Sequence, residues 1–318
     1  MPQSPRTPAP RARPGSASAQ LAGRPLTKKQ RRRQAQRAVT VSARPWWLGP
    51  YALGGGAAAV IAVIVVVVVL LTGSSVQAVS VPTPVPASVL AAVTHPSVGL
   101  FATVGSGGQS GQLSRLSGTT VLKDSSGKPE VIFVGAEYCP YCAAERWSMI
   151  MALSRFGSFT GLKEMSSESN DVDPDTSTFT FVDATYTSQW VDFSSTELYD
   201  RNDNPLQTPD SQVEQIYTTY DQPPYTASNG FPFLYIAGRF VLFQTSYDPA
   251  ILQGLSWKQI AADLGDPTSS VAQAIVGNAN YLTAAICYAT GNQPVSICTS
   301  GSIPRIETSI NAQATVGS

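Results

Sequence analysis

The stretch from Trp46 to Thr72 contains no acidic or basic side chain, and its centre, residues 57–71, reads AAAVIAVIVVVVVLL. An apolar run of about 20 residues, rising 1.5 Å per residue as a helix, crosses the ~30 Å hydrocarbon layer of a bilayer. A segment surrounded by lipid must satisfy its own backbone hydrogen bonds, so it has to be helical. The sequence therefore predicts one transmembrane helix at 46–72, which separates two unlike parts of the chain.

The charge on either side of this run predicts its orientation. Residues 1–44 hold eleven Lys/Arg and no acid, whereas the remainder holds ten Lys/Arg and all 21 acids, so the two parts carry +11 and −11. Positive charge flanks a transmembrane helix on its cytoplasmic side, and Trp46 stands where an interfacial aromatic residue belongs. We expect a single-pass cell-membrane protein with a cytoplasmic N-terminus and an extracytoplasmic C-terminal domain.

The segment 1–45 is rich in Pro, Ala, Ser, Gln and Arg, which predicts a disordered basic cytoplasmic tail. Its run from Lys28 to Arg33 suits the cytoplasmic flank of a membrane span better than a nucleic-acid site, and the exported part is acidic, so no nucleic-acid partner is expected. Small residues at Val76 and Ala78 leave a cleaved signal peptide open, although the long polar lead favours an uncleaved anchor.

The exported part begins with a Pro/Ser linker at 73–88, GSSVQAVSVPTPVPAS. Roughly 230 residues follow, enough for one hydrophobic core. We expect the domain to occupy 89–304 and a loose polar tail to occupy 305–318. His95 is the single histidine of the chain, which argues against a Ser-His-Asp hydrolase or a multi-histidine metal enzyme, and no metal or cofactor is predicted.

Apolar periodicity and turn residues predict alternating strands and helices after residue 88. Helices are expected at 88–95, from Cys139 to just before Gly157, around 211–220, and at 256–264 and 269–288. Strands are expected at 97–104, 129–135, 178–183, 233–236 and 239–245, the last two as a hairpin. The run 129–135, PEVIFVG, suits a strand buried on both faces. This order predicts an α/β domain with a mixed sheet flanked by helices.

The chemistry of the chain is predicted at Cys139-Pro140-Tyr141-Cys142, between a buried strand and a helix. Unpaired N–H groups and the dipole at a helix N-terminus favour a thiolate. Cys139 would then be an exposed nucleophile, and Cys142, one turn deeper, would resolve a mixed disulfide. Pro140 suits the first helical turn, where a missing N–H costs nothing. A zinc half-site would need further ligands that are not evident, and an inert buried pair is the other alternative.

A CxxC motif that follows a strand and opens a helix resembles the thioredoxin superfamily. That superfamily carries a cis-proline beside its active-site sulfurs, and Phe231-Pro232 stands directly before the predicted strand 233–236. The resemblance thus implies that Pro232 belongs to the catalytic site. The tetrapeptide itself resembles glutaredoxins, which are cytosolic and glutathione-dependent, whereas this domain is predicted to be exported.

A closer similarity covers about residues 90–300. The segments 135–147, GAEYCPYCAAERW, and 152–157, ALSRFG, resemble the domain of unknown function 929 family of bacterial and archaeal membrane-anchored proteins. This resemblance implies a thioredoxin-like fold and names no substrate. One departure from thioredoxins concerns the predicted strand: residues 131–134 are apolar, so the buried carboxylate that assists proton transfer is missing there. Glu137 and Glu145 flank the motif, and their charge would oppose a thiolate if close.

The second cysteine pair, Cys287 and Cys298, encloses a short turn-rich loop. In an oxidising compartment such a pair predicts a structural disulfide, and closing a loop of ~12 residues is worth about 3 kcal/mol. The alternative is a relay that exchanges electrons with Cys139 and Cys142.

These features predict a membrane-anchored extracytoplasmic thiol-disulfide oxidoreductase, with Cys139, Cys142 and Pro232 as site residues. Its partners would be protein thiols or disulfides of the cell envelope. The alternative is a non-catalytic thioredoxin-like binding or assembly module of the envelope, because a motif can persist without its reaction. The direction of electron flow and the redox partner do not follow from the residues.

Overall fold

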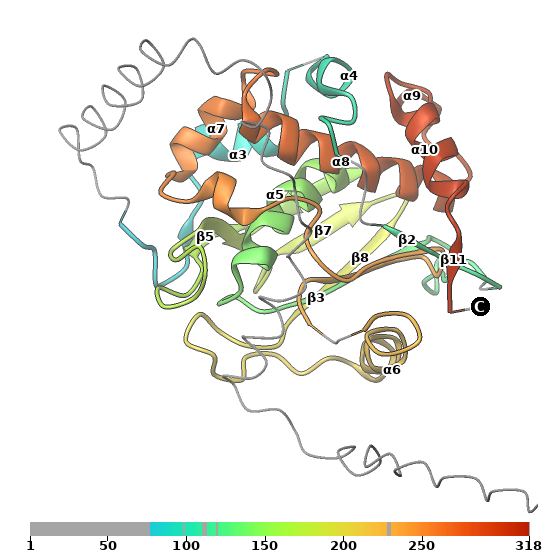
Figure 1. Ribbon diagram of the computed structural model, residues 1–318, viewed down its shortest axis with the longest axis horizontal. Coiled ribbons are helices and arrows are strands. Elements are labelled where there is room, and N and C mark those ends of the chain that lie inside the picture. Colours follow the sequence, from blue (N-terminus) through green and yellow to red (C-terminus); the bar gives the residue numbers. More distant parts are fainter. Residues whose placement is uncertain (1–76, 98, 110–112, 119, 228–229, 318) are drawn as a thin grey trace, which may run out of the picture. The chain divides into compact units, whose positions relative to one another are not determined.

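The computed structural model describes residues 77–97, 99–109, 113–118, 120–227 and 230–317 (Figure 1). The predicted basic tail at 1–45 and the predicted transmembrane helix at 46–72 lie outside these residues. Within the described ranges, no helix is both long enough and apolar enough to cross a membrane.

A six-stranded mixed sheet forms the centre of the domain. Its strands in spatial order are β11 (Thr315–Val316), β2 (Ser114–Leu116), β10 (Phe240–Leu242), β9 (Phe233–Ile236), β3 (Glu130–Gly135) and β8 (Asp192–Glu197). β3 pairs antiparallel with β9 and parallel with β8. The predicted α/β architecture with a mixed sheet is confirmed, and so are the internal strand and the hairpin of β9 and β10.

Helices cover both faces of the sheet (Figure 1). On one face, Val131 and Phe133 of β3 belong to the main core, with α5 (Pro140–Leu153) and α8 (Ser270–Ala289). On the other face, Ile132 and Val134 pack with residues of α6 (Ser211–Tyr220). Side chains alternate between the faces of a strand, so the apolar residues 131–134 of β3 are buried on both sides.

Further elements surround this layer arrangement. Two small antiparallel groups are β1 (Thr83–Pro84) with β5 (Lys163–Ser166) and β6 (Ser177–Thr180), and β4 (Gly157–Thr160) with β7 (Thr185–Ser188). The remaining helices are α3 (Ala87–Thr94), α4 (Leu100–Val104), the 3-10 helix η2 (Pro249–Leu252), α7 (Trp257–Leu264), α9 (Val295–Cys298) and α10 (Ile303–Asn311). The helices predicted at 88–95, 211–220, 256–264 and 269–288 are confirmed within a residue or two.

The strand predicted at 97–104 is wrong, because this segment contains the helix α4. Gly99 precedes the helix with φ of 100°, a left-handed conformation that interrupts extended backbone. Its carbonyl accepts a hydrogen bond from Thr103 N–H. Leu100 and Val104, four residues apart, are buried together, and the helix packs on α8. The β-branched residues of the segment 97–104 are compatible with a strand or a helix, and tertiary packing selected the helix.

The segment 73–88 was predicted to be a linker, but its described part packs on the domain. β1 pairs with β5, and Val79 N–H donates to Ser166 Oγ. An extended Pro-rich segment can add to a sheet at its edge, where a missing N–H leaves no ladder bond broken.

The loose tail predicted at 305–318 is also wrong, because α10 and β11 occupy it. Ile303, Ile306 and Ile310 are buried at helical spacing, so α10 is amphipathic although its sequence is polar on average. β11 then adds to the sheet in parallel with β2.

Candidate active site at the Cys139–Cys142 pair

The first sulfur lies at the entrance of α5, as the sequence predicts. β3 ends at Gly135, and a short turn, closed by the bond from Cys139 N–H to the Ala136 carbonyl at 3.2 Å, leads into the helix. Cys139 is the N-cap residue, and its Sγ accepts the N–H of Cys142 at 3.3 Å. Pro140 stands in the first turn, where no intrahelical donor is required. A free N–H of the helix is thus directed at Cys139 Sγ, in a geometry that suits a thiolate.

Both thiols are free and largely covered. Cys139 is 5% exposed and Cys142 is 0% exposed. The prediction of an exposed Cys139 is therefore wrong, because only a small part of its side chain reaches solvent. The reason is tertiary: the segment that leads into β9 lies against the sulfur, and Cys139 Sγ is 3.9 Å from the carbonyl oxygen of Phe231. Burial also raises the pKa of the Cys142 thiol well above its ordinary value, because desolvation disfavours the charged form.

Pro232 is buried beside this pair, directly before β9, and the Phe231–Pro232 peptide bond is cis. Pairing of Phe233 with Val134 brings the start of β9 to the C-terminal end of β3. Residues more than 90 positions apart are therefore brought together at Cys139. The structure brings together the three residues that the sequence singled out, while their catalytic roles remain a proposal.

A buried ion pair that the sequence did not predict lies deeper in the same region. Arg146 and Glu197 are both 0% exposed. Arg146 donates from Nε to Glu197 Oε1 at 2.9 Å and from Nη2 to Glu197 Oε2 at 2.7 Å, and Nη2 also donates to the carbonyl of Ala136 at 3.0 Å. Glu197 comes from β8, where it is paired in register with Gly135 of β3.

The position of this ion pair connects it to the second sulfur. Arg146 follows Cys142 by four residues, so both occupy one face of α5, one turn apart. Desolvation and then the neighbouring Cys139 are the largest causes that raise the pKa of the Cys142 thiol; within the ion pair, the guanidinium of Arg146 lowers this pKa and the carboxylate of Glu197 raises it. Helical spacing could have suggested Arg146, whereas the β8 register that supplies Glu197 had no local signal.

The two acids that flank the motif are bonded to other groups. Glu137 is buried and accepts a hydrogen bond from Thr180 Oγ1 at 2.6 Å. Glu145 is fully buried and accepts from Asn278 Nδ2 at 2.9 and 3.0 Å and from Thr245 Oγ1 at 3.2 Å. Desolvation raises the pKa of Glu137 and raises that of Glu145 to about 7.

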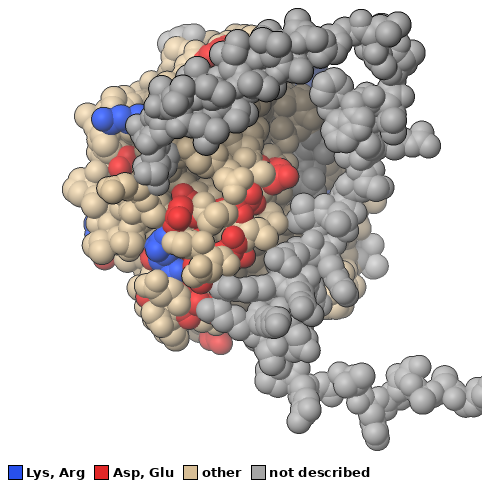
Figure 2. Space-filling model, turned by 60° about the vertical axis from the view of Figure 1, so that its left-hand side comes forward, with Lys and Arg blue, Asp and Glu red and all other residues tan. Residues whose placement is uncertain are grey.

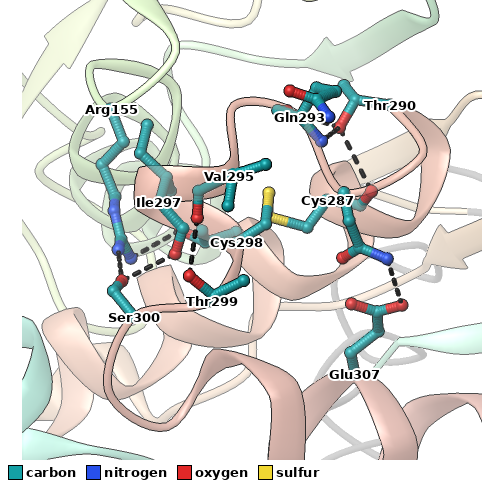
Figure 3. The surroundings of a disulfide bond; sticks show 12 residues. Arg155, Cys287, Thr290, Gln293, Val295, Ile297, Cys298, Thr299, Ser300 and Glu307 are labelled. Atoms are coloured by element: carbon teal, nitrogen blue, oxygen red, sulfur yellow. Dashed lines mark hydrogen bonds between the residues drawn. A yellow bond between two sulfur atoms is a disulfide. The ribbon is translucent and has the colours of Figure 1, made fainter.

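The second cysteine pair forms a disulfide, Cys287–Cys298, which joins the end of α8 to α9 (Figure 3). Arg155, just beyond the C-terminus of α5, donates to Ser300 Oγ at 3.0 Å beside this disulfide. Cys139 lies at the opposite end of α5, a helix of 14 residues and therefore about 20 Å long. The two pairs are thus separated in this structure, which supports a structural role for the disulfide over a relay.

Within the described residues, no three His, Cys, Asp or Glu side chains converge as metal ligands would. A family model described as "Domain of unknown function (DUF929)" matches residues 120–288. Comparisons with curated proteins and with solved structures gave no match. The matched segment includes the cysteine pair, Glu197 and Pro232, so the whole candidate site lies inside it.

Proposed function

The chain belongs to the DUF929 family, whose domain has no known function, and we propose that it is a thiol-disulfide oxidoreductase with a thioredoxin-like fold. One observation carries the proposal: Cys139 Sγ caps α5 and accepts the Cys142 N–H, with the Cys142 thiol buried one turn deeper. A nucleophilic sulfur at a helix N-terminus and a protonated partner within the first turn are the two parts that dithiol exchange requires.

The proposed reaction starts from the reduced pair. Cys139 thiolate attacks a substrate disulfide: a Cys139–substrate S–S bond forms, the substrate S–S bond breaks, and the departing thiolate takes up a proton. Cys142 then loses its proton and attacks Cys139 Sγ. The Cys139–Cys142 disulfide forms and the second substrate sulfur leaves as a thiolate, which is protonated in turn. Two electrons pass to the substrate, and an external dithiol restores the pair. The reverse sequence oxidises a substrate dithiol.

Pro232 is proposed as the third site residue. It has no N–H, so its backbone brings no donor that would compete with Cys142 for the sulfur. The carbonyl of Phe231 is the group that meets Cys139 Sγ instead.

An envelope location is proposed from two observations. The apolar run 46–72 follows the basic segment 1–44, which favours a single span with the domain outside the cytoplasm. The Cys287–Cys298 disulfide is typical of oxidising compartments. Protein thiols or disulfides of the envelope are therefore the proposed substrates.

The small exposed fraction of Cys139 favours a second candidate, a non-catalytic module that keeps the fold and binds a partner. The two candidates differ in the reactivity of Cys139. In the native state, iodoacetamide should leave the Cys139 thiol of a binding module unmodified. The same reagent should modify the Cys139 thiol of a dithiol catalyst, because that thiol must become accessible to a substrate.

The test uses the full-length protein in an uncharged detergent, with insulin disulfides as substrate and dithiothreitol as reductant. We expect Cys139→Ser to abolish the accelerated reduction. Cys142→Ser should instead accumulate a mixed disulfide between Cys139 and insulin, because the resolving thiol is gone. The double variant Cys287→Ser/Cys298→Ser is the matched control and should retain the activity. Unchanged activity in Cys139→Ser would end the proposal.

A further inference from the structure

Three aromatic rings lie beside the covered sulfur of Cys139. Tyr138, Tyr199 and Phe231, here called the aromatic triad, have ring centroids 6.1, 6.3 and 6.5 Å apart. All three are half-buried, so each keeps an exposed part. Tyr138 precedes Cys139 in the chain, and the carbonyl of Phe231 faces the sulfur. An approaching substrate therefore meets aromatic surface next to the reactive atom.

Three carboxylates lie near the motif, within electrostatic reach of Tyr141. The loop between β5 and β6, residues 167–176, is held against the motif because Glu168 N–H donates to the Tyr138 carbonyl at 3.0 Å. This loop carries Asp171 and Asp173. Asp248, the N-cap of η2, comes from a different part of the chain, and η2 packs on α5. We call Asp171, Asp173 and Asp248 the acidic rim.

The rim carboxylates are close enough to act on one another and on the motif. Desolvation raises the pKa of Asp173, and the charges of Asp248 and Asp171 raise it further. The same three carboxylates, after desolvation, help raise the pKa of Tyr141 to about 12. Crowding of like charges beside Tyr141 of the motif costs stability unless a partner of opposite charge relieves it.

Arg201, which contacts the loop that carries Asp171 and Asp173, already has an acidic partner. Arg201 is paired with Asp175 and also donates to Ser169 Oγ and to the Ser166 carbonyl. Figure 2, which brings the left-hand side of Figure 1 forward, shows more acidic than basic side chains on the part of that face that is not grey. Among the described residues, no salt bridge joins a cation to Asp171, Asp173 or Asp248, so the acidic rim adds negative charge to a face that also carries aromatic rings.

We propose that this face selects cationic polypeptide substrates, in which the reacting cysteine is flanked by Lys or Arg. The proposal rests on the proposed function and specifies its substrate class. Cationic side chains would meet the acidic rim and the faces of the aromatic triad, both of which attract positive charge. Anionic peptides and small anionic thiols would be repelled from the same face. Fields of this kind change association rates by 10- to 1,000-fold, and salt screens them.

The test compares two synthetic peptides that share one intramolecular disulfide and differ only in flanking residues, four lysines or four glutamates. Each peptide is added to the reduced full-length protein in uncharged detergent, and the second-order rate constant for oxidation of the protein is measured. At low salt the lysine peptide should react about 10-fold or more faster than the glutamate peptide. In about 1 M salt, where the Debye length is ~3 Å, the difference should shrink several-fold.

The decisive variant is Asp171→Asn/Asp173→Asn/Asp248→Asn. Asparagine keeps the Oδ1 acceptor that Asp171 offers to Val172 N–H and that Asp248 offers to Ala250 N–H. Asparagine also tolerates the left-handed φ of 50° at Asp173. This triple variant should lose most of the preference for the lysine peptide.

The matched control, Asp192→Asn/Asp210→Asn/Glu307→Gln, removes the same charge elsewhere. Asp192 and Asp210 both act on Glu130, at the end of β3 opposite the sulfurs. This control should keep the preference. Equal rates for the two peptides, or a preference that survives in the rim variant, would overturn the charge selection and leave the oxidoreductase intact. If neither peptide reacts, the proposed function fails with it.

Discussion

Replacing Arg146 with methionine removes the positive half of a fully buried ion pair and keeps much of the side-chain volume. Three hydrogen bonds are lost, two to Glu197 at 2.9 and 2.7 Å and one to the Ala136 carbonyl at 3.0 Å. Glu197 then remains at 0% exposure without its partner. Removing one member of a buried pair typically costs 3–5 kcal/mol, mostly because the other charge stays buried, so we expect a loss of about that size.

The assay is a double-mutant cycle on the free energy of unfolding in urea. Arg146→Met and Glu197→Leu should each be strongly destabilising. The double variant should be more stable than the sum of the two losses predicts by about 2 kcal/mol, since no uncompensated charge is left inside. The cycle also has a chemical readout. The charge of Arg146 lowers the pKa of the Cys142 thiol, so Arg146→Met should shift the resolution of a Cys139 mixed disulfide to higher pH.

Two results would refute this reasoning. A single-variant loss below about 1 kcal/mol would mean that Glu197 finds another partner or solvent. Additive losses in the double variant would mean that the two side chains are not coupled. An unchanged pH profile of resolution, with stability lost as expected, would restrict Arg146 to a structural role.

Two other predictions concern the core and the disulfide. Burial raises the pKa of Glu145 from 4.5 to about 7, so as pH falls the folded state binds a proton before the unfolded state does. Protonation of Glu145 therefore stabilises the folded state by about 3 kcal/mol. This stabilisation is complete below about pH 4 and is lost as pH rises through 7. Urea unfolding from pH 4.5 to 8.5 should therefore show a flatter pH dependence in Glu145→Gln, and identical slopes would contradict the assignment. Cys287→Ser/Cys298→Ser should lower the free energy of unfolding by about 3 kcal/mol, since the disulfide closes a loop with a sequence separation of 11. In urea unfolding, this variant should be as stable as the unmutated protein with its disulfide reduced.

Local sequence accounted for much of the site. The strand, the CxxC motif and the helix follow one another in the chain, so the N-cap position of Cys139 could be predicted from short-range rules. The exposure of that sulfur could not, because Phe231 covers it from a distant segment. The helix α4 and the amphipathic α10 were missed for a related reason: short apolar patterns are compatible with several structures until a neighbouring surface selects one.

The residues by themselves determined the elements whose signals are local: the doubly buried β3, the hairpin of β9 and β10, the capped helix α7 and the cysteine at the entrance of α5. Tertiary structure decided which charges reach the CxxC motif. Glu197 arrives through the parallel pairing of β8 with β3, and Asp248 arrives through the packing of η2 on α5. Register and helix packing depend on the whole core, whereas capping and periodicity depend on a few consecutive residues, and only the latter can be read directly from the chain.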